Sequence, residues 1–177
     1  MYRPDRRPGP QEAADWYQRY IARVPDIDIV SVLHRLGNST PPFLGTIDDE
    51  QWIFRYETNK WSLKESIIHV IDTERIMAYR ALRIARGDQT PLIGFSQDNY
   101  VPASNAALRT PTSIITEYRA VREATLELFR HFDETAWNRT GFASGSPVSV
   151  LALAYIIAGH ELHHLELTRT LYLKLEA

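Results

Sequence analysis

The sequence predicts an all-α protein, a four-helix bundle whose helices are joined by long crossover connections. Three observations predict this fold class. Apolar residues recur at helical spacing, strong start and stop signals bracket the helical segments, and signals for β-strands are weak. We assign residues 1–25 to an N-terminal extension that contains a helical piece, and residues 26–177 to the bundle domain.

Two helical segments are expected in the N-terminal part of the chain. The first covers residues 11–21, and Pro25 separates it from the first bundle helix over residues 27–36. Gly37 and Asn38 follow directly. Because both residue types tolerate the left-handed conformation found at helix C-termini, we expect them to end this helix.

The second bundle helix has the clearest predicted boundaries. Ser62 and Glu65 match a capping box, in which the serine side chain binds a free N–H of the first turn and the glutamate binds the N–H of Ser62. The helix is expected to run to about Arg86. Gly87 then supplies the left-handed stop.

Proline marks the expected start of the third and fourth bundle helices. Pro111 follows Thr110, and Pro147 follows Ser146. Each proline falls at the first helical position, where its missing N–H is not needed. We expect the third helix to reach about Phe132 and the fourth to run nearly to the end of the chain.

Two long links connect these helices. Residues 38–60 are expected to contain a short helix after Thr46, and residues 87–109 contain two prolines and two glycines that disfavour one long helix. Loops this long inside a compact domain are usually functional or cross between distant helices. They favour a bundle with crossover connections over a simple series of helical hairpins.

The net charge, the absence of cysteine and the lengths of the apolar runs exclude several classes of function. The 177 residues carry 20 Lys and Arg against 22 Asp and Glu, and this formal charge of −2 argues against binding to nucleic acid or an anionic membrane. Cysteine is absent, which excludes a disulfide framework, a cysteine-ligated zinc and a thiol nucleophile. The N-terminus lacks the apolar stretch of a signal peptide, and the apolar run near residues 148–158 is too short to span a bilayer. We expect a cytoplasmic protein.

Two of the six histidines lie on the apolar seam of the last helix. The residues of this seam are Val150, Leu153, Ile157, His160, His164, Leu167 and Leu171. A buried imidazole needs a hydrogen-bond partner or a metal. Since residues four apart lie on one face of a helix, His160 and His164 can bind one metal ion together.

His69 is the best candidate for a third ligand. Apolar residues flank it on both sides, so its helix is expected to be buried there, and Asp72 lies one turn on, where it can orient an imidazole. From spacing alone, a three-histidine metal site with open positions and a structural polar core both remain possible interpretations. We expect His34 and His131 at the surface.

One short motif resembles that of a zinc protease. Residues 160–164 read H-E-L-H-H and match the pattern H-E-x-x-H, in which Glu161 takes the place of the catalytic base. Such proteases find their third ligand further along the chain. The expected continuation is absent after His164, so a protease is disfavoured.

A broader resemblance covers about residues 27–172. Residues 61–75 contain W-S-x-K-E-x-x-x-H-x-x-D-T-E, and residues 158–165 contain G-H-E-x-H-H. These paired motifs, in this order, resemble those of the DinB/YfiT-like superfamily. The resemblance implies a four-helix bundle in which a histidine triad binds a divalent metal, and it places the ligands on His69, His160 and His164.

The resemblance also suggests a cofactor and a chemistry. Zinc or nickel is the expected metal, with iron or manganese as alternatives. Family members with known activity are transferases and isomerases that use thiols such as bacillithiol or mycothiol, which implies S-transfer from a cosubstrate thiol to a small electrophile. A hydrolase that uses metal-activated water and a non-catalytic metal-binding stress protein are the alternatives. The family usually has Asp where this chain has Ser96, which puts in doubt any chemistry that needs that carboxylate.

Further site residues and partners complete the prediction. Asp72 and Glu161 are candidates for a base or for a hydrogen-bond partner of a ligand, and Arg80, Asp98 and Tyr100 are candidates for substrate binding. The expected partners are a small-molecule substrate and a low-molecular-weight thiol, with no nucleic acid and no membrane. The resemblance also implies a homodimer.

Overall fold

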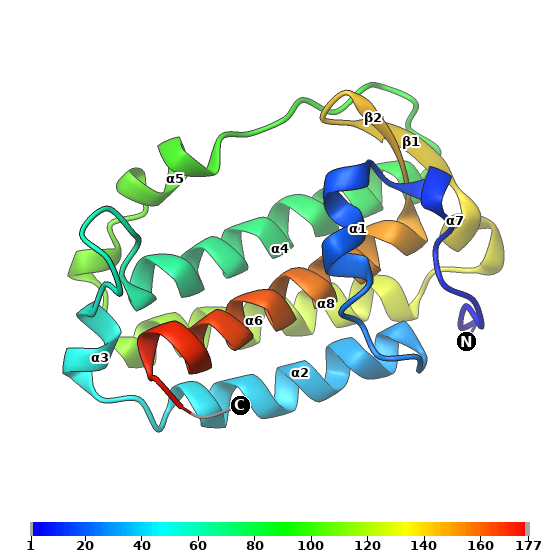
Figure 1. Cartoon of the computed structure of the whole chain (residues 1–177). Helices are drawn as coiled ribbons and strands as arrows, with labels where there is room; N and C mark the ends of the chain where they lie inside the picture. Colours follow the sequence, from blue (N-terminus) through cyan, green and yellow to red (C-terminus); the bar gives the residue numbers. More distant parts are fainter. Residues whose placement is uncertain (1, 176–177) are drawn as a thin grey trace.

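The structure, a computed structural model, describes residues 2–175 and has four long helices at its centre. They are α2 (Ile29–Leu44), α4 (Leu63–Ala85), α6 (Pro111–Arg130) and α8 (Val150–Leu167) (Figure 1). Helix α4 packs against α6 and α8, and α2 packs against the same two helices. The predicted four-helix bundle is confirmed.

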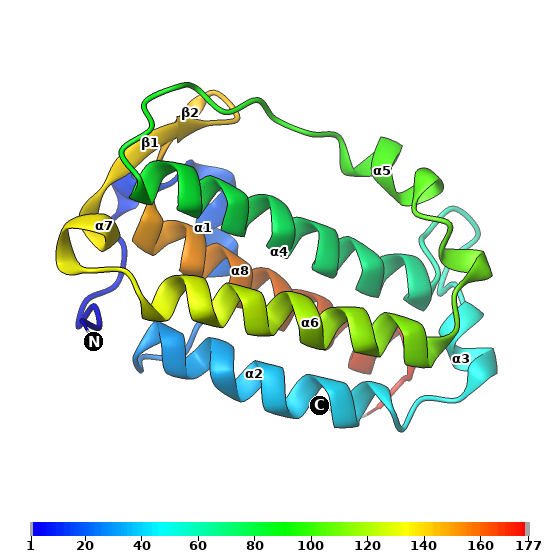
Figure 2. The ribbon, with the colours of Figure 1, turned by 180° about the vertical axis from the view of Figure 1, so that it is seen from behind.

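Shorter elements precede the first bundle helix, lie in the connections between the bundle helices and follow the last one. They are η1 (Pro10–Glu12), α1 (Asp15–Ile21), α3 (Asp49–Ile53), α5 (Gln97–Ala103), η2 (Ala106–Leu108), α7 (Glu134–Asn138), β1 (Thr140–Ala143), β2 (Ser146–Ser149) and η3 (Thr168–Tyr172). Figure 2 shows the link that carries α5 running along the outside of the bundle, on the side of α4. The expected short helix after Thr46 is α3.

The boundaries of α4 agree with the prediction. The backbone N–H of Ser62 donates to Glu65 Oε2 (2.7 Å), and the N–H of Glu65 donates to Ser62 Oγ (3.3 Å). Gly87 follows the helix with a φ of 83°. Both ends therefore depend on interactions within a few residues, which is why the sequence alone locates them.

The end of α2 differs from the prediction. The helix passes through Gly37 and continues to Leu44. A Cβ atom on Gly37 would lie 2.9 Å from Cγ of Arg122 on α6. This glycine therefore makes room for a side chain of a neighbouring helix, and the prediction that it ends the helix is wrong.

The start of the last helix also differs from the prediction. Residues 140–149 form an antiparallel hairpin whose two-residue turn has positive φ at Ser144 (52°) and Gly145 (80°). Pro147 lies in β2, and α8 begins at Val150 with Ser149 as its N-cap. The prediction of a helix start at residues 146–147 is wrong. The hairpin could not be predicted because each strand has four residues, and the alternation of polar and apolar residues is too short to be recognised in the sequence.

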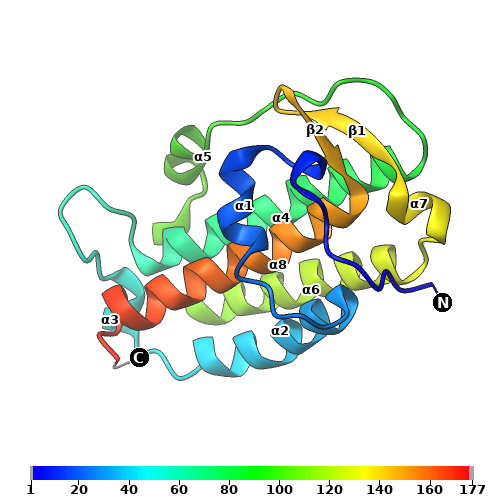
Figure 3. The same ribbon diagram turned by 45° about the vertical axis from the view of Figure 1, so that its right-hand side comes forward.

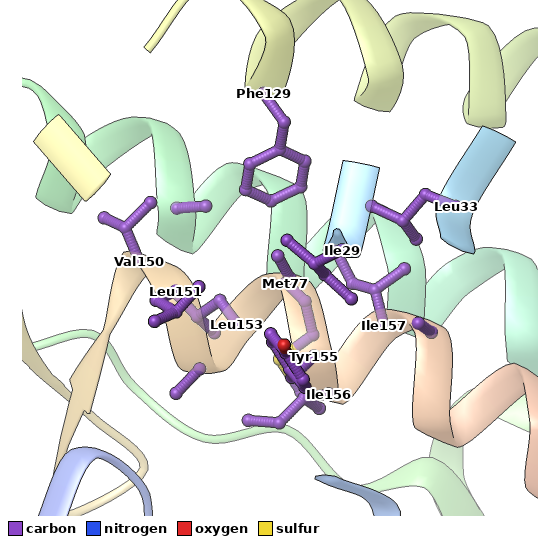
Figure 4. Close-up of a cluster of buried hydrophobic side chains, with 14 of the residues drawn as sticks. Ile29, Leu33, Met77, Phe129, Val150, Leu151, Leu153, Tyr155, Ile156 and Ile157 are labelled. Atoms are coloured by element: carbon purple, nitrogen blue, oxygen red, sulfur yellow. The ribbon is translucent and has the colours of Figure 1, made fainter. Parts of the chain in front are cut away.

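Helix α8 is the central helix of the core. Its side chains are buried on nearly all sides, as expected for a helix that is apolar around its circumference. Figure 4 shows residues of α8 packed against Ile29 and Leu33 of α2, Met77 of α4 and Phe129 of α6. Polar side chains on this helix are therefore held in fixed surroundings. Among the helices of residues 2–175, none combines the length and apolar composition needed to cross a membrane.

Candidate metal centre

The structure brings together the three predicted ligands, His69, His160 and His164. Each offers one ring nitrogen, and these atoms all lie within 4.8 Å of one another. Helix α4 supplies His69, and one face of α8 supplies the other two. All three side chains are buried, with exposed fractions of 5%, 6% and 8%.

The ring nitrogens face a common point. Nε2 of His69 lies 3.1 Å from Nε2 of His160. Nδ1 of His164 forms a hydrogen bond with Oγ of Ser66 (3.0 Å), and an ion would bind Nε2, the other ring nitrogen of His164. In a tetrahedral zinc site with ordinary Zn–N bonds, the ligand nitrogens lie roughly 3.3 Å apart. The spacing of the cluster is therefore close to that of a metal site.

Burial keeps the three imidazoles neutral. Burial lowers the pKa of His69 to about 4, although the negative charge of Asp98 acts in the opposite direction. Burial and the neighbouring histidines lower the pKa of His160 and of His164 well below the ordinary value. At neutral pH each ring therefore has an unprotonated nitrogen. Three convergent neutral imidazoles are a donor set that fits a divalent transition metal.

A cavity of about 330 Å³ opens beside this cluster. It is lined by Tyr56, Asn59, Lys60, Trp61, Ser66, Gln97, Asp98, His164, Leu167 and Tyr172. The ring of Trp61 also packs against His69, with 4.9 Å between ring centroids. The cavity combines an aromatic wall with polar side chains, so a small molecule can reach His164, the one histidine of the cluster that lines it, from this side.

A larger groove does not belong to this site. It has a volume of about 550 Å³ and lies between α4 and α6. Its lining is mainly alanine, valine and leucine side chains and includes none of the three histidines. Size alone would select this groove, but the histidine cluster lies beside the smaller cavity.

Glu161 points away from the histidines into a second buried cluster. Its Oε1 accepts hydrogen bonds from Thr40 Oγ1 and the Tyr118 hydroxyl, both at 2.6 Å. Its Oε2 accepts one from Arg122 (2.5 Å), which also binds Glu74 through two nitrogens (2.9 and 2.7 Å). These contacts fix Glu161 in the interior. No hydrogen bond joins Glu161 to the three histidines, all of which the structure describes, and its role as a base stays a prediction.

Three other predicted residues lie away from the histidines. Asp72 is half-buried beside Arg75 (3.5 Å), and no hydrogen bond joins it to the three histidines, all of which the structure describes. Arg80 is buried and donates to the Ile93 carbonyl (3.1 Å) and Ser144 Oγ (2.9 Å), which ties the α4–α6 link to the hairpin turn. Tyr100 is 47% exposed and is not part of the cavity wall.

The remaining site predictions fare differently. Asp98 lines the cavity, as expected for a substrate-binding residue. His34 and His131 are exposed, as expected from their positions.

Sequence reasoning missed Ser66 and Arg122. Arg122 falls on the buried stripe of α6 at four- and three-residue spacing, a signal that marks a charged residue at a core position.

Comparisons with known proteins agree with the fold. A protein from Oceanobacillus iheyensis, named "Putative metal-dependent hydrolase", is 24% identical over 139 residues, which cover 77% of each chain. YfiT from Bacillus subtilis, described as a probable metal-dependent hydrolase with an unusual four-helix bundle topology, superposes with a TM-score of 0.71. Its sequence is 12% identical, and the match covers 96% of this chain and 91% of YfiT.

Two further solved structures share the fold. The mycothiol-dependent maleylpyruvate isomerase superposes with a TM-score of 0.64 at 13% identity, over 78% of this chain and 59% of the isomerase. A DinB-like protein from Bacillus subtilis, YjoA, gives 0.57 at 19% identity, over 79% and 85% of the two chains. The sequence model of the DinB superfamily matches residues 33–168, about three quarters of the chain. This chain belongs to the DinB superfamily.

Proposed function

We propose that this protein is a metal-dependent hydrolase whose metal ion is held by His69, His160 and His164. The observation that carries the proposal is the convergence of three buried, neutral imidazoles beside a cavity that small molecules can enter. The names of the Oceanobacillus relative and of YfiT support the same chemistry. The donor set favours zinc or nickel, with iron or manganese as alternatives.

A divalent cation at this cluster supplies a Lewis acid and makes water nucleophilic near neutral pH. The protein's own residues orient the ligands and bind the substrate. Ser66 fixes the orientation of His164, and the ring of Trp61 packs against that of His69. The open side of the cluster faces the cavity, where the substrate binds.

Asp98 is the residue that we assign to accept the proton of the attacking water, at its carboxylate oxygen. The competing carboxylates near the cluster are occupied. Glu161 is bound in the interior, and Glu65 binds Ser62 and Arg55. Among the described residues, Asp98 is the carboxylate that lines the cavity, and its charge acts on His69. Hydrolysis needs a base in such a position.

The metal site is tested by element-resolved metal analysis of the purified protein. The native chain is expected to contain about one divalent ion, and His160→Ala is expected to lose most of it because one of three ligands is gone. His131→Ala is the matched control, since His131 is exposed on the surface. Equal metal content in native protein and His160→Ala contradicts the site.

The base is tested with Asp98→Asn. This variant is expected to keep its metal while kcat for ester or amide hydrolysis falls by roughly 10²- to 10⁴-fold, because a general base contributes about that much. Glu161→Gln is the comparison, and its kcat is expected to fall by less. If Asp98→Asn retains native kcat at full metal content, the assignment is wrong.

A thiol transferase is the second candidate function. It is favoured by the fold shared with a mycothiol-dependent isomerase and by the absence of cysteine, which requires any thiolate to come from a cosubstrate. Metal-loaded protein is to be assayed with an ester panel and an electrophile panel, each with and without added thiol. Turnover that needs thiol favours the transferase. Turnover without thiol favours the hydrolase, and bound metal with no turnover in either panel favours a non-catalytic metal-binding protein.

A further inference from the structure

The short helix α1 lies against α8 at the level of the histidines. Figure 3 shows α1 crossing beside the bundle next to α8, and the two helices are in direct contact. Residues 15–21, which form α1, precede the segment matched by the DinB superfamily at residues 33–168. The helix therefore lies outside the matched segment, yet it packs against the helix that carries His160 and His164.

Gly159 makes this approach possible. A Cβ atom at this position would lie 2.0 Å from the carbonyl oxygen of Tyr20 and 2.5 Å from its carbonyl carbon. Because these are backbone atoms, they cannot move aside as a side chain can. Gly159 immediately precedes His160, so the end of α1 is placed directly beside this predicted ligand.

The ring of Tyr20 packs on the histidine face of α8. It meets the ring of His160 edge-on, with 5.3 Å between centroids and 78° between planes. It also contacts His163, one turn on, at 5.5 Å. Edge-to-face contacts at these distances are attractive and orientation-dependent, so they hold the imidazole in one orientation.

Several contacts hold the end of α1 in place. The Arg19 guanidinium lies 4.8 Å from the centre of the Tyr20 ring and donates to its hydroxyl (2.9 Å). Arg7 donates to the backbone carbonyls of Ile21 (2.6 Å) and Val24 (2.9 Å). Position and orientation of the Tyr20 ring are thus set before any ion binds.

His160 needs such a constraint. The ring torsion of histidine has broad minima and is not fixed by the helix backbone. Ser66 orients His164 through a hydrogen bond, whereas the structure shows no hydrogen bond between Nδ1 of His160 and any described residue. Apart from the 3.1 Å contact with Nε2 of His69, packing therefore decides where Nε2 of His160 points.

We infer that Tyr20 is a positioning residue for the metal centre. Its ring holds the imidazole of His160 with Nε2 facing His69, and Gly159 is small so that α1 can bring the ring there. The inference rests on the proposed metal site. It gives Tyr20 a role in metal affinity and coordination geometry without contact to the ion.

Titration with Co²⁺, followed by its visible absorption, tests the inference because the spectrum reports ligand number and geometry directly. Tyr20→Ala is expected to weaken Co²⁺ binding by roughly 10- to 100-fold, the range found for residues that orient a ligand, and to change the spectrum. Tyr20→Phe keeps the ring and is expected to restore native affinity and spectrum. Tyr17→Ala removes a ring from the same helix away from the histidines and is expected to behave like the native chain.

The outcomes separate the two proposals. If the native chain binds no Co²⁺, the metal site itself is wrong, and the inference falls with it. If the native chain binds Co²⁺ and Tyr20→Ala matches it in affinity and spectrum, only the inference is wrong. Equal losses in Tyr17→Ala and Tyr20→Ala also overturn it, since general loosening of α1 would then explain both. Gly159→Ala is expected to reproduce the loss seen in Tyr20→Ala, and a native spectrum in a folded Gly159→Ala protein contradicts the packing argument.

Discussion

Helix α8 carries two buried polar clusters that begin at adjacent residues, His160 and Glu161. The cluster of Glu161 is closed: both of its carboxylate oxygens and all three guanidinium nitrogens of Arg122 have partners. The histidine cluster is open: Nε2 of His69 lies beside Nε2 of His160, and neither of these two rings has a hydrogen bond to any other described residue. The two adjacent clusters therefore differ in their hydrogen bonding. The polar groups of the Glu161 cluster all have partners within the protein, whereas the histidine cluster has ring nitrogens that a ligand can bind.

The closed cluster joins all four bundle helices. Thr40 and the Leu33 carbonyl come from α2, Glu74 from α4, Tyr118 and Arg122 from α6, and Glu161 from α8. Burial tends to lower the pKa of Arg122, but the two carboxylates hold it well above its usual value. Each partner therefore depends on the others to remain charged in the interior. The network favours this arrangement of the four helices over others.

The largest expected effect comes from breaking the closed cluster. Arg122→Met leaves two buried carboxylates without their cation, and it is expected to lower the free energy of unfolding by about 3–5 kcal/mol. Urea unfolding followed by circular dichroism measures this change. Arg130→Met, which removes a surface ion pair with Glu127, is the control and is expected to change stability by less than about 1 kcal/mol. Equal effects would show that the closed cluster is no more important than a surface pair.

The open cluster is expected to make the metal-free protein sensitive to acid. The pKa of His69 is about 4 in the folded state, below the ordinary value of about 6.5 for an unfolded histidine. Between these values the unfolded chain binds more protons, so stability falls as the pH drops through this window and is constant above it. His69 alone contributes a loss of roughly 3 kcal/mol.

Urea unfolding of chelator-treated protein at pH 7, 5.5 and 4 measures this dependence. His69→Gln is expected to flatten the curve, whereas His34→Gln, at an exposed position, is expected to leave it unchanged. A native protein whose stability does not change over this range contradicts the burial of neutral histidines.

A smaller effect is expected from the residue that orients His164. Ser66→Ala removes the partner of Nδ1 and is expected to weaken metal binding by roughly 10- to 100-fold. Competition with a chromogenic chelator measures the affinity. Thr73→Val is the matched control on the same helix, because the Thr73 hydroxyl is buried without a partner and should not influence the metal. The open cluster is less dependent on Ser66 than we propose if the two variants bind metal equally well.

The smallest effect is expected at Asp72. It lies beside Arg75 rather than behind a histidine, so Asp72→Asn is expected to change metal affinity by less than about twofold and stability by about 0.5 kcal/mol or less. Chelator competition and urea unfolding check both values. A tenfold loss of affinity would instead place Asp72 among the groups that orient the cluster.

Much of this arrangement could be predicted from local patterns. The ends of α4 follow from a capping box and a glycine, and the inward row of α8 follows from the spacing of its apolar residues. The same row places His160 and His164 on one face. The burial of His69 could also be predicted from the sequence, because apolar neighbours on both sides indicate a buried stretch of helix.

The remaining features depend on contacts between segments far apart in the sequence. The sequence pattern marks Gly37 as the end of a helix and places Gly159 inside the last helix without a role. In the structure Gly37 makes room for Arg122 and Gly159 makes room for the backbone of Tyr20. Glu161 stands where a protease motif has its base, but the rotation of α8 directs it into the network with Arg122.

The sequence by itself determined the helices, the bundle and the identity of three histidines on buried faces, because helical periodicity and capping act over three or four residues. Only the tertiary structure decided which buried polar groups have hydrogen-bond partners within the protein and which remain available to a ligand. That decision depends on which side chains of α1, α2 and α6 meet α8, and a one-dimensional pattern does not contain the distances between helices.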